Sequence, residues 1–209
     1  MKITGRNTKE CIFLVAAELF AERGYNNVSV RHITEKIGIK QASIYNHYTS
    51  KREILDDLLR YYLNRMEPFY QKLAFTEIGD KGGNADLEEI LDKLMLSYDE
   101  EEKLLMYQLT RIVHHEQFNH RSAAEALIGE GYRKYVAAHI VFFDRLAGKG
   151  FISGQNTRFY GELYARLSLT FATQFLHPEI VPTMEKQTEL SSFVNKLVIS
   201  YEQSLLNKE

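Results

Sequence analysis

The chain has 209 residues, of which 44% are hydrophobic and 26% are charged. This balance argues against a disordered chain, and the presence of only 3 prolines argues against a turn-rich all-β fold. The formal net charge of −2, taken over the whole chain, argues against a nucleic-acid-binding protein, because such proteins usually carry a basic surplus.

The single cysteine, Cys11, excludes an internal disulfide and a cysteine-rich zinc site. The polar N-terminal residues show no signal-peptide pattern, and no apolar run approaches the ~20 residues that span a bilayer. We therefore expect a cytoplasmic protein that makes no contact with a membrane.

Apolar residues recur with helical spacing along almost the whole chain, and no alternating strand pattern extends beyond a few residues. The fold class is therefore predicted to be all-α, with about nine helices. Four helices are expected in the first third of the chain, where glycines and capping residues mark their ends. They cover residues 9–23, 30–37, 41–47 and a stretch that starts at Lys51, after a Ser-x-x-Glu capping box, and is ended or kinked by Pro68.

A glycine-rich loop is expected over residues 76–86, and five more helices follow it. Their expected ranges are 87–98, 102–117, 122–147, 156–176 and 187–206. The last of them has a clear amphipathic pattern, which favours packing against another helix.

The second and third helices are short and are separated by a turn at Gly38, Ile39 and Lys40, which is the spacing of a helix-turn-helix. The outward face of the third helix carries small or amide side chains, which can approach or hydrogen-bond base edges. These residues are Gln41, Ala42, Ser43, Asn46 and His47. Many helical hairpins that bind nothing share this spacing, so the pattern alone leaves DNA binding open.

The distribution of charge favours DNA binding more strongly than the net charge does. Residues 1–55 contain nine Lys and Arg and five Glu, a surplus of +4, while the remainder contains 17 basic and 23 acidic residues. A basic N-terminal module on an acidic body is a common arrangement for a DNA-binding domain that is attached to a second function.

The order of residues in this module resembles the tetracycline-repressor (TetR) family of bacterial transcription regulators. The resemblance covers residues 10–55 without a gap, about a quarter of the chain. It rests on Ile12, Phe13 and Ala16, on Glu18 to Tyr25, on Ser29, Val30, Arg31 and Ile33, on Gly38 and Ile39, on Ser43 to Tyr48, and on Lys51, Ile54 and Leu55. The other three quarters resemble the family only in length and helical layout.

The resemblance implies a DNA-binding domain over residues 1–55 and a helical effector-binding and dimerisation domain over 56–209. It implies a regulator of transcription and not an enzyme, a repressor by family habit, which a small-molecule effector releases from a palindromic double-stranded DNA operator. No cofactor is expected besides that effector. The residues implied in DNA contact are Ser29, Arg31, Lys40, Gln41, Ala42, Ser43, Tyr45, Asn46, His47 and Lys51.

Three positions depart from the family pattern. Lys40 stands where a serine often caps the third helix, which puts that cap in doubt and suggests that Lys40 contacts DNA instead. Thr34 and Tyr48 stand where alanine and phenylalanine are usual, and both fit the same space with an added hydroxyl. Plainer interpretations also exist for three of the DNA candidates: Tyr45 as core, and His47 and Arg31 as solvated residues.

For the C-terminal body, we expect a homodimer through the last two helices. A row of small residues on the first of them, Gly161, Ala165, Ser168 and Ala172, would let two helices approach closely. The alternative is that this row packs inside one subunit. Aromatic residues interleaved with polar ones suggest a small-molecule pocket, although such a stripe is more often plain core. The candidates are Tyr107, Arg111, His115, Tyr132, Tyr135, His139 and Phe143.

Other functions have weaker support. The histidines of the body show no metal-ligand spacing, so no metal site is expected. An all-α enzyme is the second hypothesis, but the chain contains no nucleophile elbow, phosphate loop, metalloprotease or dinucleotide motif. A helical protein-interaction module is the third, and the full set of contact-type residues over 29–51 argues against it.

Overall fold

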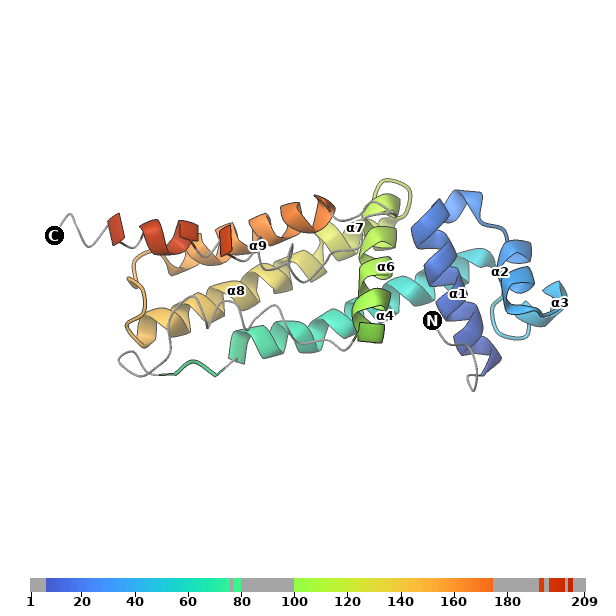
Figure 1. The fold of residues 1–209 in the computed structure, drawn as a ribbon, viewed down its shortest axis with the longest axis horizontal. Coiled ribbons are helices and arrows are strands. Elements are labelled where there is room, and N and C mark those ends of the chain that lie inside the picture. The colour runs from blue at the N-terminus through green and yellow to red at the C-terminus, as the bar shows by residue number, and fades with distance from the viewer. Residues whose placement is uncertain are drawn as a thin grey trace. The chain divides into compact units, whose positions relative to one another are not determined.

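The computed structural model describes residues 7–75, 77–79, 100–174, 192–193, 196–201 and 203–204. Within these ranges the fold is all-helical and contains no strand, which confirms the expected class (Figure 1). The described elements are α1 (Thr8–Arg23), the 3₁₀ turn η1 (Tyr25–Asn27), α2 (Val30–Ile37), α3 (Gln41–Ile44), α4 (Lys51–Phe75), α6 (Glu100–Glu116), α7 (Arg121–Ile128), α8 (Glu130–Gly148) and α9 (Thr157–Gln174). The expected helix over 87–98 and part of the one over 187–206 lie outside the described residues.

The chain forms two compact units, and neither is a single continuous segment. The first comprises Met1–Met66 and Tyr98–Tyr132, and the second comprises Glu67–Ser97 and Arg133–Glu209. In the first unit, α1 packs against α2, η1 and α6. These units are defined by how the chain packs. The expected boundary at residue 55, between a DNA-binding domain and an effector-binding domain, is defined by function and stays a prediction.

Local signals fix the ends of α1 and α2. The N–H of Gly24 closes α1 on the carbonyl of Phe20. The Ser29 hydroxyl accepts from the N–H of His32, and the Ser29 N–H donates to His32 Nδ1, so a histidine completes the capping box. Gly38 ends α2 in the left-handed region at φ 81°, a conformation that only glycine adopts without a Cβ clash. The expected boundaries at Ser29 and Gly38 are confirmed.

The helix expected over 41–47 is shorter than predicted, because α3 ends at Ile44. The N–H groups of Tyr45, Asn46 and His47 each donate to the carbonyl three residues back, which tightens the chain into turns. At the other end, Lys40 provides no side-chain cap, as its replacement of serine suggested.

α4 starts at Lys51 as expected but does not end at Pro68, which lies inside it. A proline inside a helix removes one N–H and frees the carbonyl four residues back. That carbonyl belongs to Asn64, an exposed residue, so water can satisfy it. The helix therefore tolerates the proline and continues to Phe75.

The single helix expected over 122–147 is two helices, α7 and α8, which are separated at Gly129. A Cβ at this position would lie 2.6 Å from the carbonyl oxygen of Glu125. The backbone therefore approaches itself too closely for any residue except glycine. The helical periodicity continues across the break, which is why the pattern did not reveal it.

The large apolar residues Ile12, Leu19, Phe20, Ile33 and Ile44 are all 1% exposed or less. They belong to one apolar cluster that also includes residues of α4, α6 and α7. The core of the first unit thus joins the helix-turn-helix segment to α4, which follows it directly, and to α6 and α7, whose core residues lie some sixty positions or more further along the chain.

In the second unit, α8 and α9 pack against each other at Gly161. A Cβ there would lie 2.7 Å from the Cα of Ile140 on α8, and Ala165, one turn further on, is fully buried. This end of the small-residue row therefore packs inside one chain, as the alternative interpretation held. The side chains of Ser168 and Ala172 lie outside the described residues.

His139 on α8 makes the second unit sensitive to acid. It is 2% exposed, and its Nδ1 lies 2.8 Å from the carbonyl oxygen of Tyr135, so we assign the ring proton there. Burial lowers the pKa of His139 to about 4 from its ordinary value of 6.5. Between these two values the unfolded chain binds a proton that the folded chain does not, so stability falls as the pH falls through this window.

We therefore expect the free energy of unfolding to drop by roughly 2 kcal/mol between pH 7 and pH 5 from this group, at 1.36 kcal/mol per pKa unit. Urea titrations at both pH values would measure the drop. In the variant His139→Gln, which cannot take up the proton, the drop should be smaller by the same amount. An identical drop in both proteins would show that His139 is not the sensitive group.

Candidate nucleic-acid interface

The face of α3 and the turn after it present polar side chains to solvent. Ile44 is buried and anchors the helix on the core of the first unit. Five residues around it are exposed, namely Lys40, Gln41, Ala42, Tyr45 and Asn46. Two more, Ser43 and His47, are half-buried. The expected outward face is therefore available to a partner, and α2 and α3 lie together at one side of α1 (Figure 1).

Tyr45 is 53% exposed, so the interpretation of this residue as core is wrong. The preceding residue, Ile44, takes the buried position instead, because the turn after α3 directs successive side chains to different sides. The hydroxyl of an exposed tyrosine can donate to a phosphate oxygen, and this role stays a prediction.

The basic side chains close to this face differ in whether they already form an ion pair. Arg31 donates to the carboxylate of Glu35 at 2.6 Å, and Arg52 lies 3.1 Å from that of Asp56. Lys40 makes no ion pair within the described part of the chain. A phosphate would therefore compete with an existing partner at Arg31 but not at Lys40.

Lys51 is bound within the chain. Its Nζ donates to the carbonyl oxygens of Tyr25 at 2.9 Å and Val28 at 2.8 Å, and it lies 4.0 Å from the centroid of the Tyr25 ring. Burial lowers the pKa of Lys51, and the negative charge of Glu116 opposes that shift. Two of its three N–H bonds are used here, so one remains for the expected phosphate contact, which stays a prediction.

Glu116, at the end of α6, connects this region to the rest of the first unit. One carboxylate oxygen accepts from the backbone N–H of Tyr25 at 3.2 Å, and the other lies 2.9 Å from Nδ1 of His120. The rings of Tyr25 and His120 meet edge to face with centroids 4.9 Å apart. Glu116 is 4% exposed, so this contact between η1 and α6 is shielded from solvent.

Sequence reasoning missed this cluster because its members are far apart along the chain. Tyr25 and Glu116 are separated by 91 positions, so no local pattern joins them. One signal was available: Glu116 and His120 are only four positions apart, and the turn after α6 brings their side chains together.

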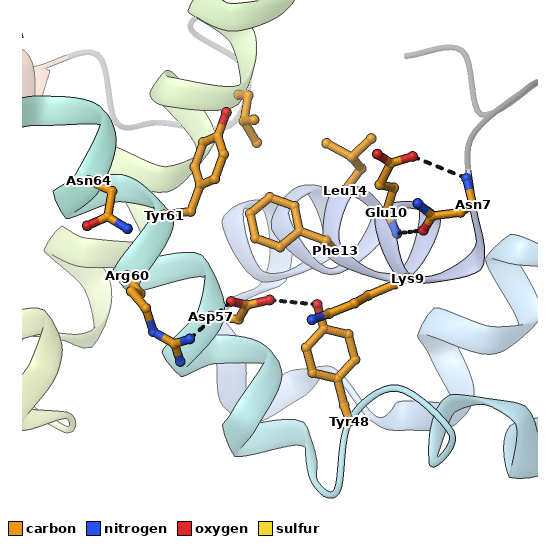
Figure 2. A pocket seen from close by; sticks show the side chains of 11 residues that line it. Asn7, Lys9, Glu10, Phe13, Leu14, Tyr48, Asp57, Arg60, Tyr61 and Asn64 are labelled. Carbon is orange, nitrogen blue, oxygen red and sulfur yellow. Dashed lines mark hydrogen bonds and ion pairs between the residues drawn. The ribbon is translucent and has the colours of Figure 1, made fainter. Parts of the chain in front are cut away.

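A cleft of about 680 Å³ lies between α1 and α4, and Leu105 of α6 also lines it (Figure 2). Phe13 and Tyr61 form part of its apolar wall and meet edge to face at 5.2 Å. On its polar side, the Tyr48 hydroxyl donates to the Asp57 carboxylate at 2.8 Å, and burial together with this bond raises the pKa of Tyr48. The added hydroxyl at position 48 therefore ties the turn after α3 to α4.

The residues expected to form a ligand pocket do not fall in one unit. Tyr107, Arg111, His115 and Tyr132 belong to the first unit, and Tyr135, His139 and Phe143 belong to the second. His115 is exposed, whereas Arg111, His139 and Phe143 are buried. In the second unit, Tyr135, His139 and Tyr164 form a chain of ring contacts, and Phe143 also contacts Tyr164.

The described residues contain neither an arrangement for a metal ion nor a helix that could span a membrane. No group of three or more His, Cys, Asp or Glu residues in these ranges is arranged to hold a metal ion. No helix in the described part of the chain has the length and hydrophobicity needed to cross a membrane.

Comparison with known proteins agrees with the geometry of the N-terminal segment. Residues 12–58 match the family model described as bacterial regulatory proteins, tetR family. The HTH-type transcriptional repressor KstR2 of Rhodococcus jostii is 33% identical over 78 residues, which are 37% of each chain. KstR2 of Mycobacterium tuberculosis is 40% identical over 60 residues, or 29% of this chain and 30% of the relative. The matches thus span about a third of the length of these relatives.

Solved structures extend the likeness in fold to nearly the whole chain. The TetR-family regulator PfmR from Thermus thermophilus has a TM-score of 0.64 at 18% identity, and the alignment covers 90% of this chain and 96% of that one. Salmonella enterica GusR has a TM-score of 0.60 at 17% identity, with 95% and 99% covered. The N-terminal residues thus match the tetR family model, and the chain as a whole is similar in fold to these solved structures.

Proposed function

We propose that this chain is a transcriptional repressor that binds a palindromic DNA operator as a homodimer and is released by a small-molecule effector. The observation that carries the proposal is the arrangement of α3, which buries Ile44 and leaves Lys40, Gln41 and Ala42 exposed. A helix held from behind by the core, with small and amide side chains in front, is suited to the major groove.

The direction of regulation is supported by the relatives' names. KstR2 is named an HTH-type transcriptional repressor in both organisms. Because the matches span only about a third of each relative, they do not indicate the ligand or the target genes of this chain. We expect it to act in the cytoplasm, where the operator lies, and to need no cofactor besides the effector.

Two copies are required by the geometry of a palindrome. Recognition helices must be about 34–36 Å apart, or slightly more, to enter successive major grooves on one side of the duplex. We propose that α9 and the C-terminal segment form the dimer, with contacts other than Gly161, which faces α8 of its own chain. An effector that changes the spacing would weaken DNA binding without touching the DNA contacts. A monomeric mass in light scattering at micromolar concentration would refute the dimer.

The proposal is tested by selecting bound sequences from random duplex DNA and then titrating the selected duplex with salt. We expect a palindromic consensus and a linear fall of log affinity with log salt, with a slope of about −0.9 for each phosphate contacted. A selection that yields no consensus, and complexes that do not respond to salt, would rule out sequence-specific DNA binding.

Replacing Tyr45 with phenylalanine tests the predicted phosphate contact. A hydrogen bond to a charged group contributes about 1.5–3 kcal/mol, so Tyr45→Phe should weaken operator binding about tenfold or more. The exposed hydroxyl supports no core packing, so the melting temperature should stay unchanged. Tyr61→Phe, on α4 in the cleft, is the matched control and should bind DNA like the parent protein. Equal affinities for all three proteins would remove Tyr45 from the interface.

A further inference from the structure

In the described part of the chain, one face of α6 buries polar atoms that have no hydrogen-bond partner. They are Gln108 Oε1, Arg111 Nε, Arg111 Nη2 and His114 Nε2. The three residues follow one another at a spacing of three, which places neighbouring pairs on the same face of the helix. Arg111 is only 3% exposed. All three belong to the first compact unit and lie on the helix whose last residue, Glu116, contacts η1.

Leaving two N–H groups of a buried guanidinium without a partner is costly, because no hydrogen bond replaces the hydration that these groups lose. The two free nitrogens, Nε and Nη2, form one edge of the planar group. This edge presents two parallel N–H bonds, the geometry that a carboxylate accepts in a bidentate pair. Tyr107, whose ring centroid lies 5.9 Å from the Arg111 Cζ, contacts the guanidinium but leaves this edge open.

The charge of the cluster limits the kind of ligand. Burial and the neighbouring His115 lower the pKa of His114, so its imidazole is neutral at pH 7. Arg111 is then the one positive charge among the three residues, which matches a monoanion better than a dianionic phosphate. The free oxygen of Gln108 is an acceptor, so it requires a donor on the ligand and not a second acidic oxygen.

We propose that Arg111, Gln108 and His114 form the binding site for a small organic acid that carries a hydroxyl or amine beside its carboxylate. The carboxylate pairs side-on with the free edge of Arg111, and the hydroxyl or amine donates to Gln108 Oε1. This inference rests on the proposed function only in naming such an acid as the effector. The binding itself requires no DNA.

The test uses the full chain without DNA and two minimal probes. Sodium formate supplies a carboxylate alone, and sodium glycolate adds a hydroxyl, while sodium chloride at equal ionic strength controls for screening. Because a ligand that binds only the folded state raises its stability, we expect the melting temperature to rise by about 3 °C at about 100 mM glycolate and less in formate. The absence of any rise over chloride would overturn the proposal.

Variants separate this site from general anion binding. Arg111→Met removes the unpaired charge, so it should raise the melting temperature by about 3 °C and abolish the glycolate response. Gln108→Glu places a carboxylate one helical turn from Arg111, so it should stabilise the protein and also abolish the response, and it serves if Arg111→Met fails to fold. Arg121→Met, at a side chain that is 92% exposed, is the matched control and should respond like the parent. A full response in Gln108→Glu would overturn the site.

Gel shifts with the selected operator keep the two proposals distinguishable. If the protein binds operator DNA but glycolate does not stabilise it, the acid-binding site is refuted and the DNA-binding function stands. If glycolate stabilises the parent protein and not the Arg111 variant while no DNA is bound, the site stands and the proposed function falls.

Discussion

Replacing Glu116 with alanine should lower the free energy of unfolding by about 3 kcal/mol, because it leaves two buried polar groups without partners. The groups are the backbone N–H of Tyr25 and the Nδ1 of His120, both of which contact this carboxylate. Thermal or urea unfolding would measure the loss, and for a chain of this size it corresponds to roughly 6–12 °C in melting temperature.

Two further variants show whether that loss of stability comes from the buried contacts of Glu116. Glu116→Gln keeps an acceptor for Tyr25 and should cost less than half as much. Glu125→Ala removes a carboxylate that is 52% exposed and lies 3.8 Å from Arg121, so it should change stability by no more than about 0.5 kcal/mol. If Glu116→Ala were no more destabilising than Glu125→Ala, the contact between η1 and α6 would not hold the unit together.

The second large effect is expected at Ala42, in the middle of the exposed face of α3. The variant Ala42→Glu places a negative charge where the proposal places the major groove. A like charge at an interface costs several kcal/mol, so operator affinity should fall about a hundredfold or more. Since the side chain is exposed, unfolding should be almost unaffected. Fluorescence anisotropy with the selected duplex measures the affinity.

The control adds the same charge away from α3. Asn119 is exposed in the turn between α6 and α7, so Asn119→Glu changes the net charge equally without entering the proposed interface. It should retain affinity within a small factor at moderate salt, because exposed charges are screened beyond about 10 Å. Similar losses in both variants would point to net charge and not to the position of α3.

The parts of the fold that local chemistry determines could be predicted from the sequence. Ser29 begins α2 because a serine hydroxyl caps free N–H groups, and Gly38 ends it because glycine adopts a positive φ. The outward face of α3, with Gln41, Ala42 and Asn46, could also be predicted, since helical periodicity determines which side is buried. The roles of the exposed residues in DNA contact remain predictions.

Three other features of the fold and of the site could not be predicted in this way. The break at Gly129 depends on the approach of its backbone to Glu125, which apolar spacing does not encode. The continuation of α4 through Pro68 depends on the exposure of Asn64, whose carbonyl the proline leaves without a helical donor. Arg111 was expected in a pocket because of its aromatic neighbours, but its free hydrogen-bonding edge depends on the atoms that surround it in the fold.

The discontinuous first unit also affects the order of events during synthesis. The helix-turn-helix emerges from the ribosome early, yet α6 and α7, which complete its apolar cluster, come more than thirty positions after Met66. Contacts with such long sequence separation form late, because a large loop must close first. The nascent N-terminal segment therefore exposes apolar surface until residue 132 has been made, and a chain that ends before that point should be a substrate for chaperones or proteases.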